Sequence, residues 1–178
     1  MLTRLPARIS ILWGDTRVRM AVSFLLILGG LNFLYYLEKK LALGIWDQPY
    51  TYFVAWLSGY LCRIILPYSI SISGDIIGVD GRTSVIIQSG CNGLEALFLM
   101  AAGILSFPAS WHQRLGGLVR YLPLIFILNL FRVVLLVYIA HSHSAYLNVF
   151  HFQIAQGILI VFVLSFWIHY IRRADQRL

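Results

Sequence analysis

Residues 118–140 read LVRYLPLIFILNLFRVVLLVYIA, an apolar run long enough to cross a lipid bilayer as one helix. Arg120 lies near the start of this run, whereas Asn129 and Arg132 stand deep inside it, and their spacing puts them on the same helical face. An arginine at this depth costs at least about 2.5 kcal/mol on insertion scales, so it requires a partner or a wet cavity. We therefore interpret the run as a membrane helix whose polar face either carries function or joins a neighbouring helix.

The composition of the whole chain agrees with a membrane protein. Of its 178 residues, 60% are hydrophobic and 12% are charged, whereas about a quarter of the residues in a soluble domain are charged. The net charge is +7, but Lys and Arg gather at the chain ends and in short connections, as they do at the cytoplasmic flanks of membrane helices. This placement favours contact with membrane lipid and argues against nucleic-acid binding.

Other apolar runs bring the predicted number of transmembrane helices to about five. These runs are Met20–Leu37, Tyr50–Pro67, Asn92–Phe107 and His151–Ile171. With a basic leader over residues 1–19, they predict an all-α polytopic protein that forms a single membrane domain over residues 1–178. Residues 91–171 contain the candidate catalytic helices.

A β-hairpin outside the lipid is expected over residues 68–90. Residues 70–73 alternate Ile and Ser, residues 85–87 are β-branched, and Asp80-Gly81 between them is a strong turn signal. The hairpin leads directly into the candidate catalytic helices. We expect it on the extracytoplasmic side, because the basic turn after residue 108 and the basic tail are typical of cytoplasmic segments.

The first 50 residues contradict this orientation. Five crossings would place the N-terminus outside, yet the leader is the most Arg-rich segment, and Lys39 and Lys40 also favour the inside. One of the first two apolar runs is therefore a candidate for a partial or re-entrant span.

Cys91 stands where an extended segment meets the expected start of a helix, between Gly90 and Gly93. A helix N-terminus favours the thiolate form, because its N–H groups are unpaired and its dipole end is positive. The flanking glycines would let a substrate backbone approach closely. The alternative is a small residue that only packs at a helix start.

His151 opens the last apolar run, and its ordinary pKa suits proton transfer near neutral pH. The alternative is an interfacial histidine that anchors its helix. His141 and His143 precede it in the chain, but no carboxylate accompanies this His-x-His pair. Metal sites need more ligands than that, so we expect neither a metal nor a cofactor.

With the hairpin outside, Cys91, Arg132 and His151 fall at the same level of the membrane. A thiolate nucleophile, an imidazole acid/base and a guanidinium that holds an oxyanion form an acyl-transfer set. Four further residues are expected to support this set: Asn92, Gly93, Glu95 and Asn129. Of these, Glu95 could pair with Arg132 or His151, or offset the positive end of its helix.

The run Gly90-Cys91-Asn92-Gly93-Leu94, the later Asn129-Leu-Phe-Arg132 and the final His151 resemble the exosortase/archaeosortase family of membrane cysteine transpeptidases. The resemblance covers roughly residues 55–171. The histidine as third member is typical of the bacterial exosortase branch. The short chain and the run Cys-Asn-Gly-Leu-Glu-Ala are most similar to the exosortase H subgroup.

The resemblance implies a function and a location. Exosortases act on exported proteins whose C-terminal sorting signal has a short motif, a transmembrane helix and a basic tail. By this resemblance, Cys91 attacks the scissile carbonyl and forms a thioester, and Arg132 stabilises the oxyanion. His151 protonates the leaving amine and later activates the acceptor. The implied location is the bacterial cytoplasmic (inner) membrane, with the site facing the extracytoplasmic side.

Three other functions are open at this point. An intramembrane cysteine protease would use the same residues with water as the acceptor. A small polytopic transporter would line its path with Arg132 and Asn129 and would not need Cys91. An assembly subunit would use these polar groups only to join helices, and its Cys91 would be inert towards alkylation.

Overall fold

The computed structural model describes residues 16–88 and 90–175. For five of these it describes the backbone alone: Tyr146, Asn148, His151, Phe152 and Asp175. The first 15 residues of the predicted leader lie outside the described part. The described chain is mostly helical, with helices α2 (Thr16–Lys40), α3 (Asp47–Ile65), α4 (Leu94–Ser106), α5 (Trp111–Ser142), α6 (Leu147–Val149) and α7 (Gln156–Asp175), and strands β1 (Ile70–Ser73), β2 (Ile76–Val79) and β3 (Thr83–Ile86).

Within the described ranges, three helical segments are long and apolar enough to cross a membrane: Thr16–Lys40, Trp111–Ser142 and Gln153–Ala174. Helix α4 has 13 residues. That corresponds to about 20 Å, less than the roughly 30 Å of a hydrocarbon core. Helix α3 begins with Asp47, carries Arg63 in its last turn and is not one of the three. The prediction of about five transmembrane helices is therefore confirmed only in part.

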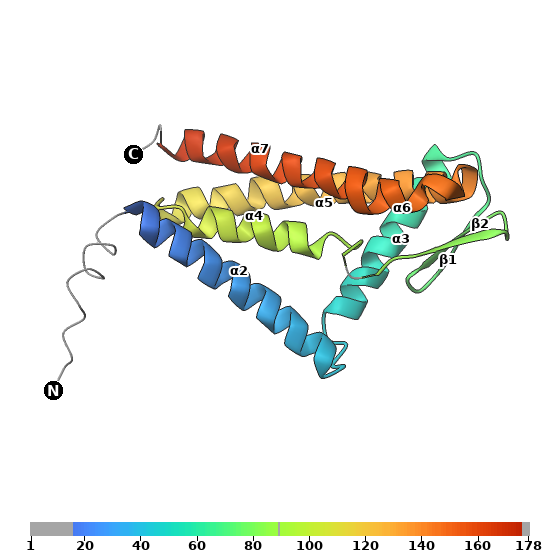
Figure 1. Cartoon of the computed structure of the whole chain (residues 1–178), viewed down its shortest axis with the longest axis horizontal. Helices are drawn as coiled ribbons and strands as arrows, with labels where there is room; N and C mark the ends of the chain where they lie inside the picture. The colour runs from blue at the N-terminus through green and yellow to red at the C-terminus, as the bar shows by residue number, and fades with distance from the viewer. Residues whose placement is uncertain (1–15, 89, 176–178) are drawn as a thin grey trace.

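Helices α4, α5 and α7 lie side by side along the long axis of the molecule, and α2 packs against α4 (Figure 1). Helix α3 instead lies across one end of this bundle, where it contacts α5 and the sheet. The start of α2, the turn from α4 to α5 and the end of α7 all lie at the opposite end. The described chain therefore starts and finishes at the same end of the bundle.

The predicted hairpin is a three-stranded antiparallel sheet in the order β1-β2-β3. Its expected turn is present, because Asp80 and Gly81 take positive φ values of 50° and 64° between β2 and β3. A second turn at Gly74, with φ of 61°, pairs Ser73 with Ile76. The sequence prediction did not include this turn, although Gly74-Asp75 is also a two-residue turn signal.

Helix α5 extends beyond its predicted apolar run at both ends. Helix α5 starts at Trp111 and not at Leu118, because Ser110 and Gln113 form a capping box. At its other end α5 runs to Ser142, and the segment between it and the last apolar run is largely helical, with a 3-10 turn at Ser144–Tyr146 and α6. A π-helix at Phe150–Ala155 then leads into α7.

The buried side chains form two main clusters. One joins α3, the sheet and the second half of α5, and it includes Cys91. The other joins α4, the first half of α5 and α7. The loop that carries Cys91 is therefore packed between the sheet, α3 and α5, at the end of the bundle that α3 crosses.

Candidate active site

Cys91 lies in a tight loop before α4. Its N–H and that of Asn92 both donate to the Gln88 carbonyl, at 2.9 and 3.1 Å. Helix α4 begins only at Leu94, whose N–H donates to Asn92 Oδ1 at 3.2 Å. The expectation that Cys91 sits at the helix N-terminus is therefore wrong. It precedes the helix, and the side chain of Asn92 satisfies an N–H of the first turn.

Asn92 ties this loop to α3. Its side chain is fully buried, and its Nδ2 donates to Thr51 Oγ1 at 3.1 Å and to Asp47 Oδ1 at 3.3 Å. Its carbonyl accepts a hydrogen bond from the Tyr50 hydroxyl at 3.3 Å. The first turns of α3 thus hold the residue next to Cys91. Sequence analysis missed these three partners, although polar residues at the start of an apolar run were a usable signal.

Gly93 and Asn129 form a second close contact with the loop. Gly93 has a φ of +81°, and a Cβ on it would lie 2.4 Å from Asn129 Cγ. Asn129 Nδ2 donates to the carbonyl of Asn92 at 2.9 Å and to that of Cys91 at 3.4 Å. The glycine therefore makes room for a side chain of α5, and not for the substrate backbone that the sequence suggested.

Arg132 reaches the same loop from one turn further along α5. Its Nη1 and Nη2 each donate to the Gly90 carbonyl at 3.4 Å, and Nη1 also donates to Asn129 Oδ1 at 3.3 Å. The residue is 7% exposed, and its buried Nε has no hydrogen-bond partner among the described residues. Leaving a buried donor unpaired costs about 1–3 kcal/mol, so Nε is a donor available to a ligand oxygen.

The Cys91 thiol is buried beside this guanidinium. Cys91 is 6% exposed and belongs to the same buried cluster as Val133 and Val134 of α5. Burial raises the pKa of the Cys91 thiol, and the positive charge of Arg132 acts in the opposite direction. Burial is the larger of the two effects, so the pKa of the thiol lies above its ordinary value, whereas a helix N-terminus would have favoured the thiolate. Ionisation needs a base, and Arg132 makes that ionisation easier.

A cavity of about 180 Å³ lies beside Arg132. Its other lining residues are apolar side chains of α5 and of residues 150–162, among them Phe131 and Phe150. Pockets of this kind bind an apolar segment and orient it through a few polar groups. A peptide carbonyl in this cavity would meet one charged donor in apolar surroundings.

The backbone of His151 lies in the π-helix Phe150–Ala155, next to a residue that lines this cavity. Single π-helical turns are frequent at functional sites. The side chain of His151 lies outside the described part of the chain, and its role stays a prediction. Glu95, in the first turn of α4, lies within electrostatic reach of Arg132.

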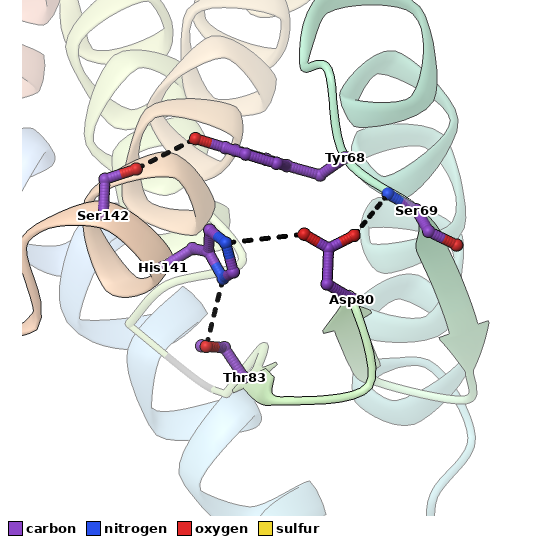
Figure 2. A network of polar contacts seen from close by, with 6 residues as sticks. All are labelled: Tyr68, Ser69, Asp80, Thr83, His141 and Ser142. Atoms are coloured by element: carbon purple, nitrogen blue, oxygen red, sulfur yellow. Dashed lines mark hydrogen bonds and ion pairs between the residues drawn. The ribbon is translucent and has the colours of Figure 1, made fainter.

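His141 belongs to a separate polar cluster at the end of α5 (Figure 2). Its Nε2 lies 3.5 Å from Asp80 Oδ2, its Nδ1 lies 3.2 Å from Thr83 Oγ1, and its ring packs on Tyr68. Sequence analysis found no carboxylate for this histidine because Asp80 is far away in the chain. The cluster fastens the tip of the sheet to α5. Among the described residues, no group of three or more His, Cys, Asp or Glu side chains is arranged to hold a metal ion.

Fold and site together define a helical integral membrane protein in which a cysteine loop is held by an intramembrane arginine. The family model described as transmembrane exosortase (Exosortase_EpsH) matches residues 3–171. The chain therefore belongs to the transmembrane exosortase family, and the resemblance is confirmed at this level. No curated protein and no solved structure matches the chain. The exosortase H subgroup stays a prediction.

Proposed function

We propose that the protein is a membrane cysteine transpeptidase that cleaves a C-terminal sorting signal of exported proteins and passes the new C-terminus to an acceptor. Family membership indicates a membrane transpeptidase or protease role. The proposed substrate carries a short motif, a transmembrane helix and a basic tail. The proposed nucleophile is Cys91.

Each proposed step moves defined atoms. A base, assigned to His151, takes the thiol proton, and the Cys91 sulfur attacks the scissile carbonyl carbon. Arg132 donates to the oxyanion of the tetrahedral intermediate. The C–N bond then breaks, the leaving amine receives the proton from His151, and a thioester remains on Cys91. The acceptor attacks this thioester, the C–S bond breaks, and the thiol regains its proton.

The observation that carries the proposal is the attachment of Arg132 to the cysteine loop. Two guanidinium nitrogens bind the Gly90 carbonyl, one residue before Cys91, while the buried Nε stays without a partner in the described structure. The same residue lines the apolar cavity. Oxyanion stabilisation requires a hydrogen-bond donor that is already oriented, shielded from water and close to the nucleophile. A transporter path would not need Arg132 to be tied to the cysteine loop.

The distribution of charge supports an orientation in the bacterial cytoplasmic membrane. At the end of the bundle where α2 starts and α7 finishes, the described arginines are Arg17, Arg19, Arg114, Arg120, Arg172 and Arg173. At the other end the described basic residues of the helix ends and turns are fewer: Lys39, Lys40, Arg63 and Arg82. By the positive-inside rule the first end is cytoplasmic. The sheet and the Cys91 loop then face the extracytoplasmic side.

The test is processing of a tagged exported protein that carries a candidate sorting tail. Cys91→Ala and Cys91→Ser should lower processing by at least about 10²-fold, because the covalent step is lost. The matched control is Cys62→Ala, which removes the other buried cysteine, on α3. Full processing by Cys91→Ala would contradict the proposal. A product formed only with water, even when an acceptor amine is present, would favour the protease alternative.

A further inference from the structure

Two polar cavities lie beside α2 and α3, and the larger of them reaches Gln88 at the Cys91 loop. The larger, of about 400 Å³, is lined by residues that include Thr51, Asp75 and Gln88. The smaller, of about 240 Å³, is lined by residues that include Glu38. Both are lined by Lys39, Asp47 and Gln48, so they form one polar region. We call this region the acidic cavity.

Glu38 is the unusual member of the acidic cavity. It is 4% exposed, and its Oε1 accepts the N–H groups of Trp46 and Asp47, both at 3.1 Å, at the start of α3. Its Oε2 is buried and finds no hydrogen-bond partner in the described part of the chain. A buried carboxylate oxygen without a donor is costly. Oε1 alone accepts the N–H groups at the start of α3. The unpaired Oε2 therefore indicates a ligand that donates a hydrogen bond to it.

The charges of the acidic cavity select the chemistry of this ligand. Its lining contains three carboxylates, those of Glu38, Asp47 and Asp75, and one ammonium group, that of Lys39. This excess of negative charge repels phosphates and carboxylates and attracts a cation. The three acids do not form a metal-binding group among the described residues. A cation that donates N–H bonds, such as a primary ammonium, fits both the charge and the unpaired Oε2.

The acidic cavity is connected to the nucleophile through the backbone of its loop. Gln88 lines the cavity, and its carbonyl accepts the N–H of Cys91. Asp47 lines it as well and accepts a hydrogen bond from Asn92. The apolar cavity beside Arg132 shares no lining residue with it. Arg132, which binds the Cys91 loop, lines the apolar cavity, and Gln88 of the loop lines the acidic one. The loop is therefore linked to two separate cavities, one for each substrate of a two-substrate reaction.

We propose that the acidic cavity is the acceptor subsite and holds a primary ammonium group, an inference that rests on the proposed function. The nitrogen, after losing one proton to solvent, attacks the acyl carbon of the thioester. A C–N bond forms and the C–S bond to Cys91 breaks. The second proton lost by nitrogen returns to the sulfur. The product is an amide, and no oxidant or metal takes part.

The first experiment uses the full-length enzyme in bilayers, a tagged protein with a sorting tail, and ethanolamine as the probe. Glu38→Gln and Asp75→Asn should each raise the KM for ethanolamine by about tenfold, because each removes a charge-assisted contact. The ratio of amide to hydrolysis product should fall in parallel. The matched control is Asp80→Asn, an acid in the turn between β2 and β3 that lines neither cavity, which should leave this KM unchanged.

The lipid composition of the bilayer distinguishes two sources of the amine, a lipid headgroup and a soluble molecule. Amide formation in phosphatidylethanolamine bilayers without added ethanolamine, and its absence in phosphatidylcholine bilayers, would assign the ammonium to a lipid headgroup. Amide formation that requires free ethanolamine in both bilayers would assign it to a soluble acceptor. Both results support a primary ammonium in the acidic cavity.

A second measurement separates this inference from the proposed function. Ethanolamine binding to the Cys91→Ala protein needs no catalysis and is followed by calorimetry. Glu38→Gln in that background should weaken binding by about tenfold. Equal binding with and without Glu38 would overturn the acceptor subsite, as would an unchanged KM in both cavity variants. A wild-type enzyme that forms no thioester would contradict the proposed function instead, and the binding result would still decide the ammonium site.

Discussion

Replacing Gly93 with alanine should dismantle the loop that holds Cys91. The new Cβ would lie 2.4 Å from Asn129 Cγ and 2.5 Å from its Nδ2, so the amide must move. Holding an L-residue at the φ of Gly93 costs about 1–2 kcal/mol. Each buried carbonyl that loses its donor costs about 1–3 kcal/mol more. Strain and one lost bond together predict a loss of about 2–5 kcal/mol of unfolding free energy.

The assay is denaturant unfolding of the full-length protein in detergent, together with turnover. The matched control is Gly116→Ala in α5, where a Cβ would meet nothing within 4 Å. This control should be neutral or more stable by up to about 1 kcal/mol, because alanine favours a helix over glycine. Adding Asn129→Ala to Gly93→Ala should cost less than the sum of the two single changes, since the clash is then gone.

Two results would refute the reasoning about this contact. One is a Gly93→Ala protein as stable as the Gly116→Ala control. The other is strict additivity between Gly93→Ala and Asn129→Ala, because residues that share a clash must couple.

Three further predictions follow from the same contacts. Arg132→Lys should lower turnover by at least about 10²-fold. Two guanidinium nitrogens bind the Gly90 carbonyl, and a lysine ammonium cannot replace both of them and also donate to an oxyanion. Retained turnover would contradict the oxyanion role. Burial raises the pKa of the Cys91 thiol, and the charge of Arg132 opposes this rise. The rate of Cys91 alkylation, plotted against pH, should therefore inflect above the ordinary thiol pKa of about 8.5, and at a still higher pH in Arg132→Gln. An inflection that moves to lower pH in Arg132→Gln would contradict the assigned electrostatics. His141→Ala should cost no more than about 1 kcal/mol of unfolding free energy, because the side chains of His141 and Asp80 are 20% and 37% exposed to solvent. A much larger loss would contradict this limit on the contribution of a solvent-exposed pair.

Two features could be predicted from the sequence: that the chain is a membrane protein, and which residues surround Cys91 in its loop. The apolar runs, the Asp80-Gly81 turn and the Asn129-x-x-Arg132 face are local patterns, and each depends on residues within a few positions of one another. The need of Arg132 for a partner followed from the cost of an unpaired charge in lipid. The structure identifies that partner as the backbone of the Cys91 loop.

Contacts between distant segments could not be predicted in this way. The position of α3 across the end of the bundle could not be predicted, because its apolar run resembles a transmembrane helix. What holds α3 there includes the hydrogen bonds from Asn92 to Asp47 and Thr51, which join segments far apart in the chain. The pairing of Asp80 with His141 likewise joins residues far apart in the chain. Burial raises the pKa of the Cys91 thiol, and this burial comes from segments far apart in the chain, so it could not be read from the position of Cys91 in the sequence.

The central claim is that Cys91 forms a thioester with an exported protein. Its most direct test is mass spectrometry of the enzyme after co-expression with a tagged protein that carries a sorting tail, with the acceptor withheld. The account predicts a hydroxylamine-sensitive adduct on Cys91 that is absent from Cys91→Ala and unchanged in the Cys62→Ala control. Processing of the tagged protein without any adduct on Cys91, or with the adduct on another residue, would contradict it.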